Sequence, residues 1–188
     1  MITLGLIADT HVPDRAVRLH PNVLPVFRRA GVQAILHAGD VSVPRLLDEL
    51  GTVAPVHAVR GNRDLYRLGR LPGKLQLEFG GVSIGLVHGH GNLLSYLVEK
   101  PRNLLFGLDE EIYIRYALSV FPEVQVIVFG HMHRVVNQRR EGKLMVDPGS
   151  ACCVLDKEKG PSVGLLHIHD GGQVEAEIIY LKAATGGA

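Results

Sequence analysis

The first third of the chain alternates apolar runs with segments of helical pattern, and this alternation limits the folds open to it. Apolar runs at residues 2–8, 33–38 and 55–59 have the length and composition of strands buried on both faces. The segments between them, 21–30 and 43–50, predict helices. Strand, helix, strand, helix and strand at this spacing predict a parallel sheet with right-handed crossovers.

The second half of the chain is expected to supply an antiparallel part. Residues 75–79 and 82–87 flank a Gly-Gly turn, which is a strong signal for a hairpin. A helix at 109–120 and a buried strand at 124–129 follow. Short strands complete the pattern at 134–139, 143–147, 163–168 and 173–180. The expected fold class is α/β, with two packed mixed β-sheets flanked by helices in a four-layer α/β/β/α sandwich.

Length and composition exclude several classes of protein. The 188 residues suit a single domain, expected over 1–182, with 183–188 as a frayed tail. The 20 basic and 19 acidic residues nearly cancel, so no dedicated nucleic-acid surface is predicted, and the basic run at 134–143 is interpreted as a solvated hairpin. No apolar run reaches the ~18 residues of a membrane span, so no membrane partner is expected.

The cysteines favour a cytoplasmic location. Cys152 and Cys153 are adjacent, and vicinal cysteines rarely form a comfortable disulfide. The apolar N-terminal stretch lacks a basic lead-in and soon meets Asp9, so it is interpreted as a strand and not as a signal peptide.

Five polar motifs directly follow predicted strands. In open α/β sheets, ligands bind beyond the carboxyl ends of the strands, so motifs on separate strands are expected to converge on one crevice. Each motif alone also fits an ordinary turn or a hydrogen-bonded histidine. Their joint placement indicates a shared site. The motifs are Asp9-Thr10-His11, Gly39-Asp40, Gly61-Asn62-Arg63-Asp64, His88-Gly89-His90 and Gly130-His131-Met132-His133.

The side chains of these motifs suit a metal centre. Carboxylate and amide oxygens and imidazole nitrogens favour manganese, iron, zinc, nickel or magnesium over soft ions. Asp40 has two carboxylate oxygens and could bridge two cations. Ions ~3.5–4 Å apart suit phosphoryl chemistry, because they clamp both the attacking and the leaving oxygen. Two divalent ions are therefore the expected cofactors, with manganese as the first choice.

Taken in order, the motifs resemble those of the calcineurin-like metallophosphoesterases, and look most like the small bacterial and archaeal phosphodiesterase branch. The resemblance covers roughly residues 2–150 and ends at Asp-Pro-Gly-Ser, where the family commonly has Asn-Pro-Gly-Ser. It implies that a hydroxide bridging two metals attacks phosphorus in line. It also implies two ligand sets that share Asp40. The first is Asp9, His11, Asp40 and His133, and the second is Asp40, Asn62, His88 and His131.

Two departures from the family pattern bear on the chemistry. Arg63 stands where many relatives have a histidine. Arginine is a poor general acid, but it can stabilise phosphate charge through bidentate hydrogen bonds. His90 is then an alternative proton donor. The segment from Gly91 to Pro122 also looks long, and it is interpreted as a lid, a dimer contact or a substrate-selecting wall.

The expected function is hydrolysis of phosphodiester bonds in a small phosphoester, with catalytic roles for Asp40, Asn62, Arg63 and His90. Two alternatives stay open: a phosphomonoesterase acting on nucleotides or phosphoproteins, and a non-catalytic, protein-binding scaffold of the same fold. Homo-oligomerisation is also left open. His37 is expected to be a hydrogen-bonded core residue, and Asp64 is expected to orient the backbone or a ligand histidine.

Overall fold

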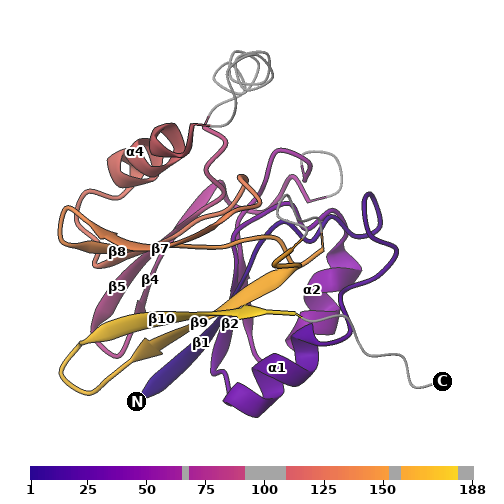
Figure 1. Cartoon of the computed structure of the whole chain (residues 1–188), viewed down its shortest axis with the longest axis horizontal. Helices are drawn as coiled ribbons and strands as arrows, with labels where there is room; N and C mark the ends of the chain where they lie inside the picture. The colour runs from indigo at the N-terminus through magenta and orange to yellow at the C-terminus, as the bar shows by residue number, and fades with distance from the viewer. Residues whose placement is uncertain (65–67, 92–108, 153–157, 182–188) are drawn as a thin grey trace.

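The structure, a computed structural model, describes residues 1–64, 68–91, 109–152 and 158–181. Figure 1 shows two sheets packed face to face. The expected frayed tail at 183–188 lies outside these residues, as does most of the segment from Gly91 to Pro122. The roles expected for that segment, and the division into one domain and a tail, stay predictions.

The first sheet combines the N-terminal and C-terminal strands of the chain in the order β10-β9-β1-β2-β3. β1, β2 and β3 run parallel, as their alternation with helices predicts. β9 runs antiparallel to β1, and β10 runs antiparallel to β9. The strands are β1 (Ile2–Ile7), β2 (Ala34–His37), β3 (Val56–Ala58), β9 (Ser162–Ile168) and β10 (Val174–Tyr180).

The second sheet has the order β4-β5-β6-β8-β7 and is also mixed. The hairpins β4–β5 and β7–β8 are antiparallel, but β5, β6 and β8 form a parallel centre. This sheet is therefore mixed, as expected, with a parallel centre where the two antiparallel hairpins meet β6. A crossover connects β5 to the parallel strand β6, and β8 then pairs in parallel with the other side of β6. The strands are β4 (Lys74–Phe79), β5 (Val82–Val87), β6 (Val126–Val128), β7 (Val135–Arg140) and β8 (Lys143–Pro148).

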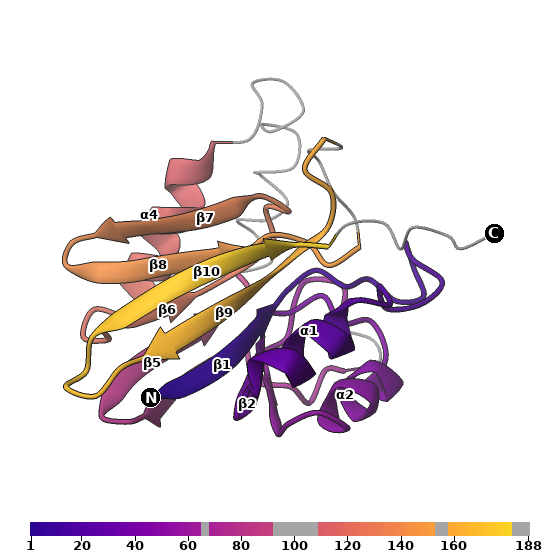
Figure 2. The same ribbon diagram turned by 60° about the horizontal axis from the view of Figure 1, so that its bottom comes forward.

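Helices cover the outer faces of both sheets (Figures 1 and 2). α1 (Val23–Ala30) and α2 (Pro44–Gly51) pack on the first sheet, and α4 (Glu110–Val120) packs on the second. Phe27 of α1 and Tyr113 of α4 are among the largest fully buried side chains. The predicted four-layer α/β/β/α fold is confirmed. Among the residues described, no helix has the length and apolar character needed to cross a membrane.

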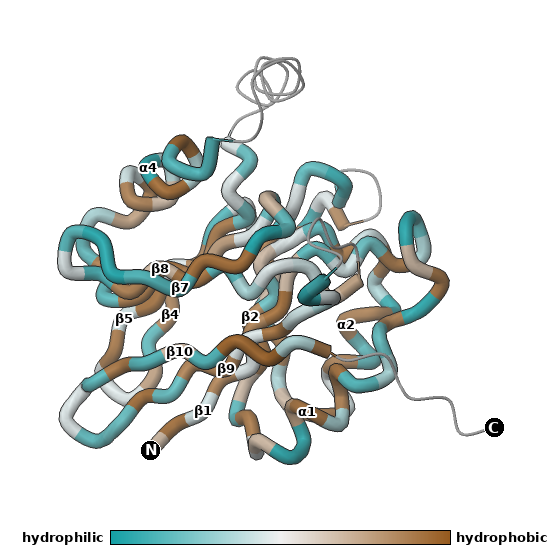
Figure 3. The backbone as a smooth tube through the Cα atoms, viewed as in Figure 1, coloured by the Kyte–Doolittle hydropathy of each residue, from teal (hydrophilic) through white to brown (hydrophobic). Residues whose placement is uncertain are grey.

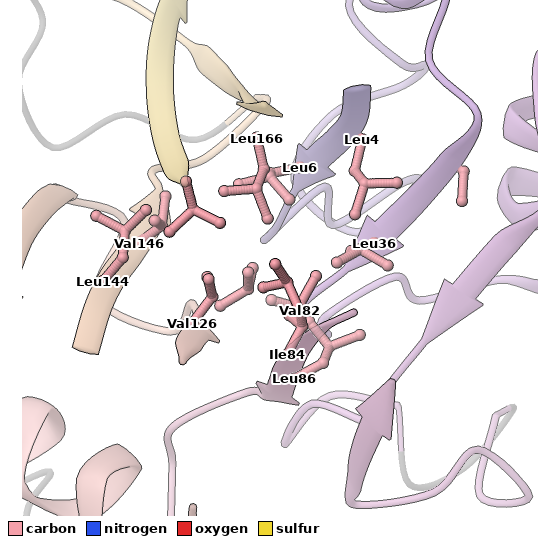
Figure 4. Close-up of a cluster of buried hydrophobic side chains, with 14 of the residues drawn as sticks. Leu4, Leu6, Leu36, Val82, Ile84, Leu86, Val126, Leu144, Val146 and Leu166 are labelled. Atoms are coloured by element: carbon pink, nitrogen blue, oxygen red, sulfur yellow. The ribbon is translucent and has the colours of Figure 1, made fainter. Parts of the chain in front are cut away.

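Apolar side chains from both sheets meet in a central core (Figure 4). Leu4 and Leu6 of β1 face Ile84 and Leu86 of β5 across this layer, and all four are fully buried. Burying one such side chain contributes about 1.5–3 kcal/mol. The turns joining β7 to β8 and β9 to β10 are hydrophilic, whereas the strands carry the apolar residues (Figure 3). The core therefore fixes how the two sheets sit on each other.

Candidate metal centre

The five polar motifs directly follow β1, β2, β3, β5 and β6, and the structure brings them to one place. Backbone hydrogen bonds join neighbouring motifs within each sheet. Asp9 donates its N–H to Gly39 O at 3.0 Å, and His11 donates to Asp40 O at 3.0 Å. In the second sheet, Gly130 donates to His88 O at 3.2 Å. The parallel strands of both sheets therefore deliver their polar ends to a common site.

Several of the motif residues have left-handed backbone conformations. Non-glycine residues rarely adopt positive φ, which costs about 1–3 kcal/mol, and such strain gathers at functional sites. These turns swing the side chains off the strand ends toward one another. The residues are Asp9 (φ 51°), His11 (46°), Asp40 (55°), His131 (77°) and His133 (55°).

A first group of donor atoms comes from Asp9, His11 and His133, whose ligand atoms lie within 4.8 Å of one another. The Nε2 atoms of His11 and His133 are 3.1 Å apart. Asp9 Oδ1 lies 3.8 Å from His11 Nε2 and 3.6 Å from His133 Nε2. Asp40 Oδ2 lies 3.6 Å from His11 Nε2. All four residues of the first expected ligand set are therefore together.

A second group surrounds Nε2 of His88. Asp40 Oδ1 lies 3.5 Å from this atom, Asn62 Oδ1 lies 3.1 Å from it, and His131 Nδ1 lies 3.3 Å from it. These are the members of the second expected set. Asp9 is also within reach, because an oxygen of its carboxylate lies within 4.8 Å of a carboxylate oxygen of Asp40 and of a ring nitrogen of His88. The sequence motifs gave no signal that Asp9 would lie near both groups.

The tautomer of His88 shows that this group suits a cation. Its Nδ1 lies 2.7 Å from the carbonyl oxygen of Ala38, which only accepts hydrogen bonds, so Nδ1 carries the proton. In the neutral ring Nε2 then presents a lone pair, and this lone pair faces the Asp40 carboxylate. A divalent cation between these two electron-rich atoms would turn a repulsive contact into ligation.

Burial keeps His11, His88 and His131 neutral in the metal-free chain. It lowers the pKa of His88 to about 3, and the pKa of His11 and His131 to about 2, with neighbouring histidines adding to the effect. Their contacts with carboxylates are therefore not ion pairs near neutral pH. Burial raises the pKa of Asp40 to about 6, although the Arg63 N–H hydrogen bond lowers it. A bound cation would favour the charged carboxylate and the neutral rings together.

Two buried residues support the site from behind. Asp64 accepts a hydrogen bond from Ser42 N at Oδ1 and from Gly61 N at Oδ2, both at 2.8 Å. It thus orients the backbone that follows β2 and β3, one of the two roles expected for it. His37 accepts from Gly39 N at 3.2 Å and contacts Thr10 Oγ1 at 3.1 Å, as expected of a hydrogen-bonded core histidine.

Arg63 and His90 flank the two groups. The exposed Arg63 donates its backbone N–H to Asp40 Oδ1 at 2.9 Å, and its positive charge lowers the pKa of both Asp40 and His11. The His90 ring centroid lies 5.1 Å from that of His88 and 6.1 Å from that of His131. Both residues therefore border the donor atoms. Their catalytic roles stay predictions.

Two residues near the site had no signal in the motifs. Arg15 donates its N–H to His11 O at 2.8 Å, and its positive charge also lowers the pKa of His11. Ser150 donates its hydroxyl to Asp9 O at 2.8 Å and holds the first motif from the far end of the chain. The sequence Asp-Pro-Gly-Ser marked the end of the family resemblance, but it did not predict this contact.

Comparisons with known proteins agree with this geometry. A family model described as a calcineurin-like phosphoesterase superfamily domain matches residues 2–171. A probable metallophosphoesterase of Methanothermobacter thermautotrophicus is 34% identical over 176 residues, which cover 94% of this chain and 91% of that protein. A second, from Methanocaldococcus jannaschii, is 32% identical over 147 residues, or 78% of this chain and 67% of that protein.

Solved structures share the fold. Vps29 of Entamoeba histolytica in complex with Zn²⁺ superposes with a TM-score of 0.68 at 26% identity, covering 95% of this chain and 98% of that one. A structure described as a novel archaeal phosphodiesterase gives a TM-score of 0.66 at 18% identity, over 95% of this chain and all of that one. At that identity the second likeness concerns the fold alone.

Proposed function

Because this chain belongs to the calcineurin-like phosphoesterase superfamily, we propose that it hydrolyses phosphodiester bonds of small phosphoesters at a centre of two divalent metal ions. One observation carries the two-ion proposal. The two oxygens of Asp40 face different histidines, with Oδ2 3.6 Å from His11 Nε2 and Oδ1 3.5 Å from His88 Nε2. A carboxylate in this position can serve two ions at once.

The family uses divalent metals, and the donor atoms here fit them. Asp9, His11, Asp40 and His133 would hold one ion, and Asp40, Asn62, His88 and His131 would hold the other. When bound, such ions activate water near neutral pH and neutralise charge on the phosphate oxygens. Manganese is the first choice for this set of oxygen and nitrogen donors, with iron, zinc, nickel and magnesium as alternatives.

The side chains around the centre supply the remaining steps. Arg63 binds the non-bridging phosphate oxygens through its guanidinium fork, and the positive charge of Arg15 adds to the attraction. His90 gives a proton to the departing alkoxide from its protonated ring. Burial lowers the pKa of this ring, so the step is favoured at pH values below the ordinary imidazole pKa. Asn62 places its amide oxygen 3.1 Å from His88 Nε2, where the two electron-rich atoms would share the second ion. Asp64 keeps the turns after β2 and β3 in register.

The vacuolar protein sorting neighbours favour a second candidate function, that of a protein-binding scaffold. The seven expected ligands lie together, and this supports the enzyme, because protein binding alone does not require metal-competent side chains at one place. The preference for diesters over monoesters rests on the Gly-Asn-x-Asp form of the third motif, which looks like that of the small phosphodiesterases.

The test combines elemental analysis with a panel of esters. We expect two equivalents of metal in the purified protein and metal-dependent hydrolysis of bis(p-nitrophenyl) phosphate that exceeds hydrolysis of p-nitrophenyl phosphate. Cyclic 2′,3′ and 3′,5′ nucleotides extend the panel toward natural diesters. Faster hydrolysis of the monoester would replace the diester proposal, and metal binding without any hydrolysis would favour the scaffold.

The proposed location is the cytoplasm, as the cysteines predict. Cell fractionation tests it. The oligomeric state is open, and light scattering on the purified protein would determine it.

A further inference from the structure

A cavity of about 290 Å³ lies beside the candidate metal centre. It is enclosed by the residues before β4, the first residue of β4, the end of β5 and one face of α4. Its described lining consists of Arg60, Gly73, Lys74, Val87, Gly89, His90, Gly91, Tyr116 and Val120. The motif that supplies His88 to the metal centre therefore also supplies part of the cavity wall.

His90 lies between the cavity and the metal centre. The ring of this residue lies 5.1 Å from the ring of His88 and also lines the cavity. Lys74 pairs with Val87 across the β4–β5 hairpin, one residue before His88. A group attached to a phosphate at the metal centre can thus extend past His90 toward Lys74.

Two positive charges give the cavity its chemical character. Arg60 and Lys74 both line it, and within the described part of the chain neither has a carboxylate partner. The Arg60 guanidinium donates to Gly69 O at 3.1 Å, and the Lys74 ammonium lies 6.0 Å from the Phe121 ring centroid. A carbonyl and an aromatic ring leave most of the donors on these cations available. The described lining contains no acidic residue.

The remaining walls are apolar, and the volume is small. Tyr116 and Val120, one helical turn apart on α4, face Val87. Sites for drug-sized ligands span roughly 300–1,000 Å³, and the volume of this cavity lies just below that range. It fits a short aliphatic chain with a charged end better than it fits a large ring system.

We propose that this cavity binds one ester arm of the substrate, and that the arm is a short aliphatic chain ending in a carboxylate or phosphate. This inference rests on the proposed phosphodiesterase function. Arg60 and Lys74 bind the anionic end, and the valines and Tyr116 contact the chain.

Four p-nitrophenyl diesters test the charge preference. Their second arms have similar length and end in a methyl, a carboxylate, a phosphonate or a trimethylammonium group. We expect the anionic arms to lower KM by about ten-fold relative to the methyl arm, since hydrogen bonds to charged groups contribute about 1.5–3 kcal/mol. The cationic arm raises KM. Comparing the carboxylate with the phosphonate shows which anion the cavity prefers.

The double variant Arg60→Gln, Lys74→Gln should give similar KM values for the anionic, methyl and cationic arms. Its metal content and its hydrolysis of the methyl-terminated ester should stay near the parent values. Arg28→Gln with Arg29→Gln is the matched control, because it removes two charges from α1, far from α4 in Figure 1. The inference is overturned if the parent protein shows no lower KM for the anionic arms, or if the double variant still shows it.

Calorimetric binding of the same esters separates this inference from the proposed function. If no ester is hydrolysed but the anionic arms still bind more tightly to the parent than to the double variant, the function fails and the cavity assignment stands. Equal binding of all four esters to the parent contradicts the cavity assignment, whether or not hydrolysis occurs.

Discussion

Asp40 shows how much of the site depends on single residues. Only 2% of this residue is exposed, and its two oxygens face His11 and His88. Burial makes its charged form costly in the metal-free chain, as its raised pKa of about 6 indicates. The carboxylate is therefore best explained by the cations that it would serve.

Replacing Asp40 with asparagine tests this directly. Asp40→Asn keeps the shape and can still accept the Arg63 N–H, but it removes the negative charge. We expect both metal occupancies to fall and turnover to drop by about 100-fold or more, while the circular dichroism spectrum is unchanged. Elemental analysis and steady-state kinetics measure the two effects. Two retained metals with near-normal turnover would show that Asp40 does not bridge.

Arg63 and His90 should differ in how their loss depends on the leaving group. Arg63→Ala removes charge stabilisation worth ~1.5 kcal/mol, hence about ten-fold in kcat/KM, for good and poor leaving groups alike. His90→Ala should cost little with nitrophenolate and much with an alkoxide, because only the alkoxide needs a proton. A series of diesters with leaving groups of graded pKa measures how the loss in kcat/KM depends on leaving-group pKa for each variant. A steep dependence in Arg63→Ala with none in His90→Ala would reverse the assignment.

The buried histidines predict a pH dependence for the metal-free protein. Burial holds the pKa of His11, His88 and His131 at about 2–3, below the ordinary 6.5. Their stabilising contribution is complete above pH 6.5 and is lost as pH falls toward the folded values, by up to about 1.4 kcal/mol per pH unit each. The pKa of Asp40 is raised to about 6, so this residue has the opposite effect on stability. Between pH 6 and 3.8 it offsets the stability loss of roughly one histidine.

We therefore expect the metal-free protein, kept in EDTA, to lose thermal stability as pH is lowered from 7 to 5. Melting curves in EDTA at half-unit intervals measure the slope. A melting temperature that is constant or rises over this interval contradicts the assignment of neutral, buried rings.

The sequence indicated seven metal-competent residues through their residue types and their positions after strands, and the structure brings them together. Their role as metal ligands stays a prediction. The sequence did not predict that Asp9 would lie near both donor groups, or that Arg15 would act on His11. Both follow from the left-handed turns at Asp9 and His11, with φ of 51° and 46°. Neither turn is marked by a glycine, and although Asp and His adopt positive φ more often than other side chains do, that preference is too weak to predict these turns.

At the scale of elements, side chains of one edge strand donate hydrogen bonds to backbone carbonyl oxygens of an edge strand in the other sheet. β7 and β10 are edge strands of different sheets. Asn137 of β7 donates to Ala176 O at 2.7 Å, and Arg139 donates to Val174 O at 3.0 Å. These carbonyl oxygens belong to β10, which pairs only with β9 within the described residues. The two side chains therefore cover part of an edge that another chain could otherwise extend.

Removing these contacts should weaken the fold without touching the chemistry. Asn137→Ala and Arg139→Ala should each cost about 0.5–1.5 kcal/mol of unfolding free energy, with kcat/KM unchanged. Gln138→Ala is the matched control, since its side chain lies on the opposite face of β7. Urea denaturation measures the three values. Equal losses in all three variants would show that the cross-sheet bonds contribute nothing.

The sequence predicted all thirteen described helices and strands to within two residues at each end. Apolar periodicity and Gly-containing turns are local signals, so they locate elements well. The strand order of the second sheet is not local. β8 pairs with β6 as well as with its hairpin partner β7, and only the packing of α4 and the central core selects that arrangement.

At the scale of the whole molecule, the metal centre spans the two sheets. Asp9, His11, Asp40 and Asn62 follow strands of the first sheet, whereas His88, His131 and His133 follow strands of the second. Bound ions would therefore hold the sheets together at one end of the sandwich, in addition to the central apolar core.

Metal should consequently raise the stability of the whole fold. A ligand at 100 times its dissociation constant adds about 2.7 kcal/mol when it binds only the folded state. We expect the melting temperature to rise on addition of Mn²⁺ and to return with EDTA. His11→Ala and His88→Ala, one from each sheet, should each reduce the rise. An equal rise in Asp40→Asn would indicate that the ions bind elsewhere.

The position of β1 in its sheet has a consequence for synthesis of the chain. β1 is made before the other described strands, yet it lies between β2 and β9, and β9 begins only at Ser162. Asp9 and His11 thus leave the ribosome long before His133, which lies beside them, and before Ser150, which donates to Asp9 O. A nascent chain would carry these ligands without their partners until the later residues are made. Metal uptake would then mark the close of folding, and a stalled or truncated chain would lack the means to retain its ions.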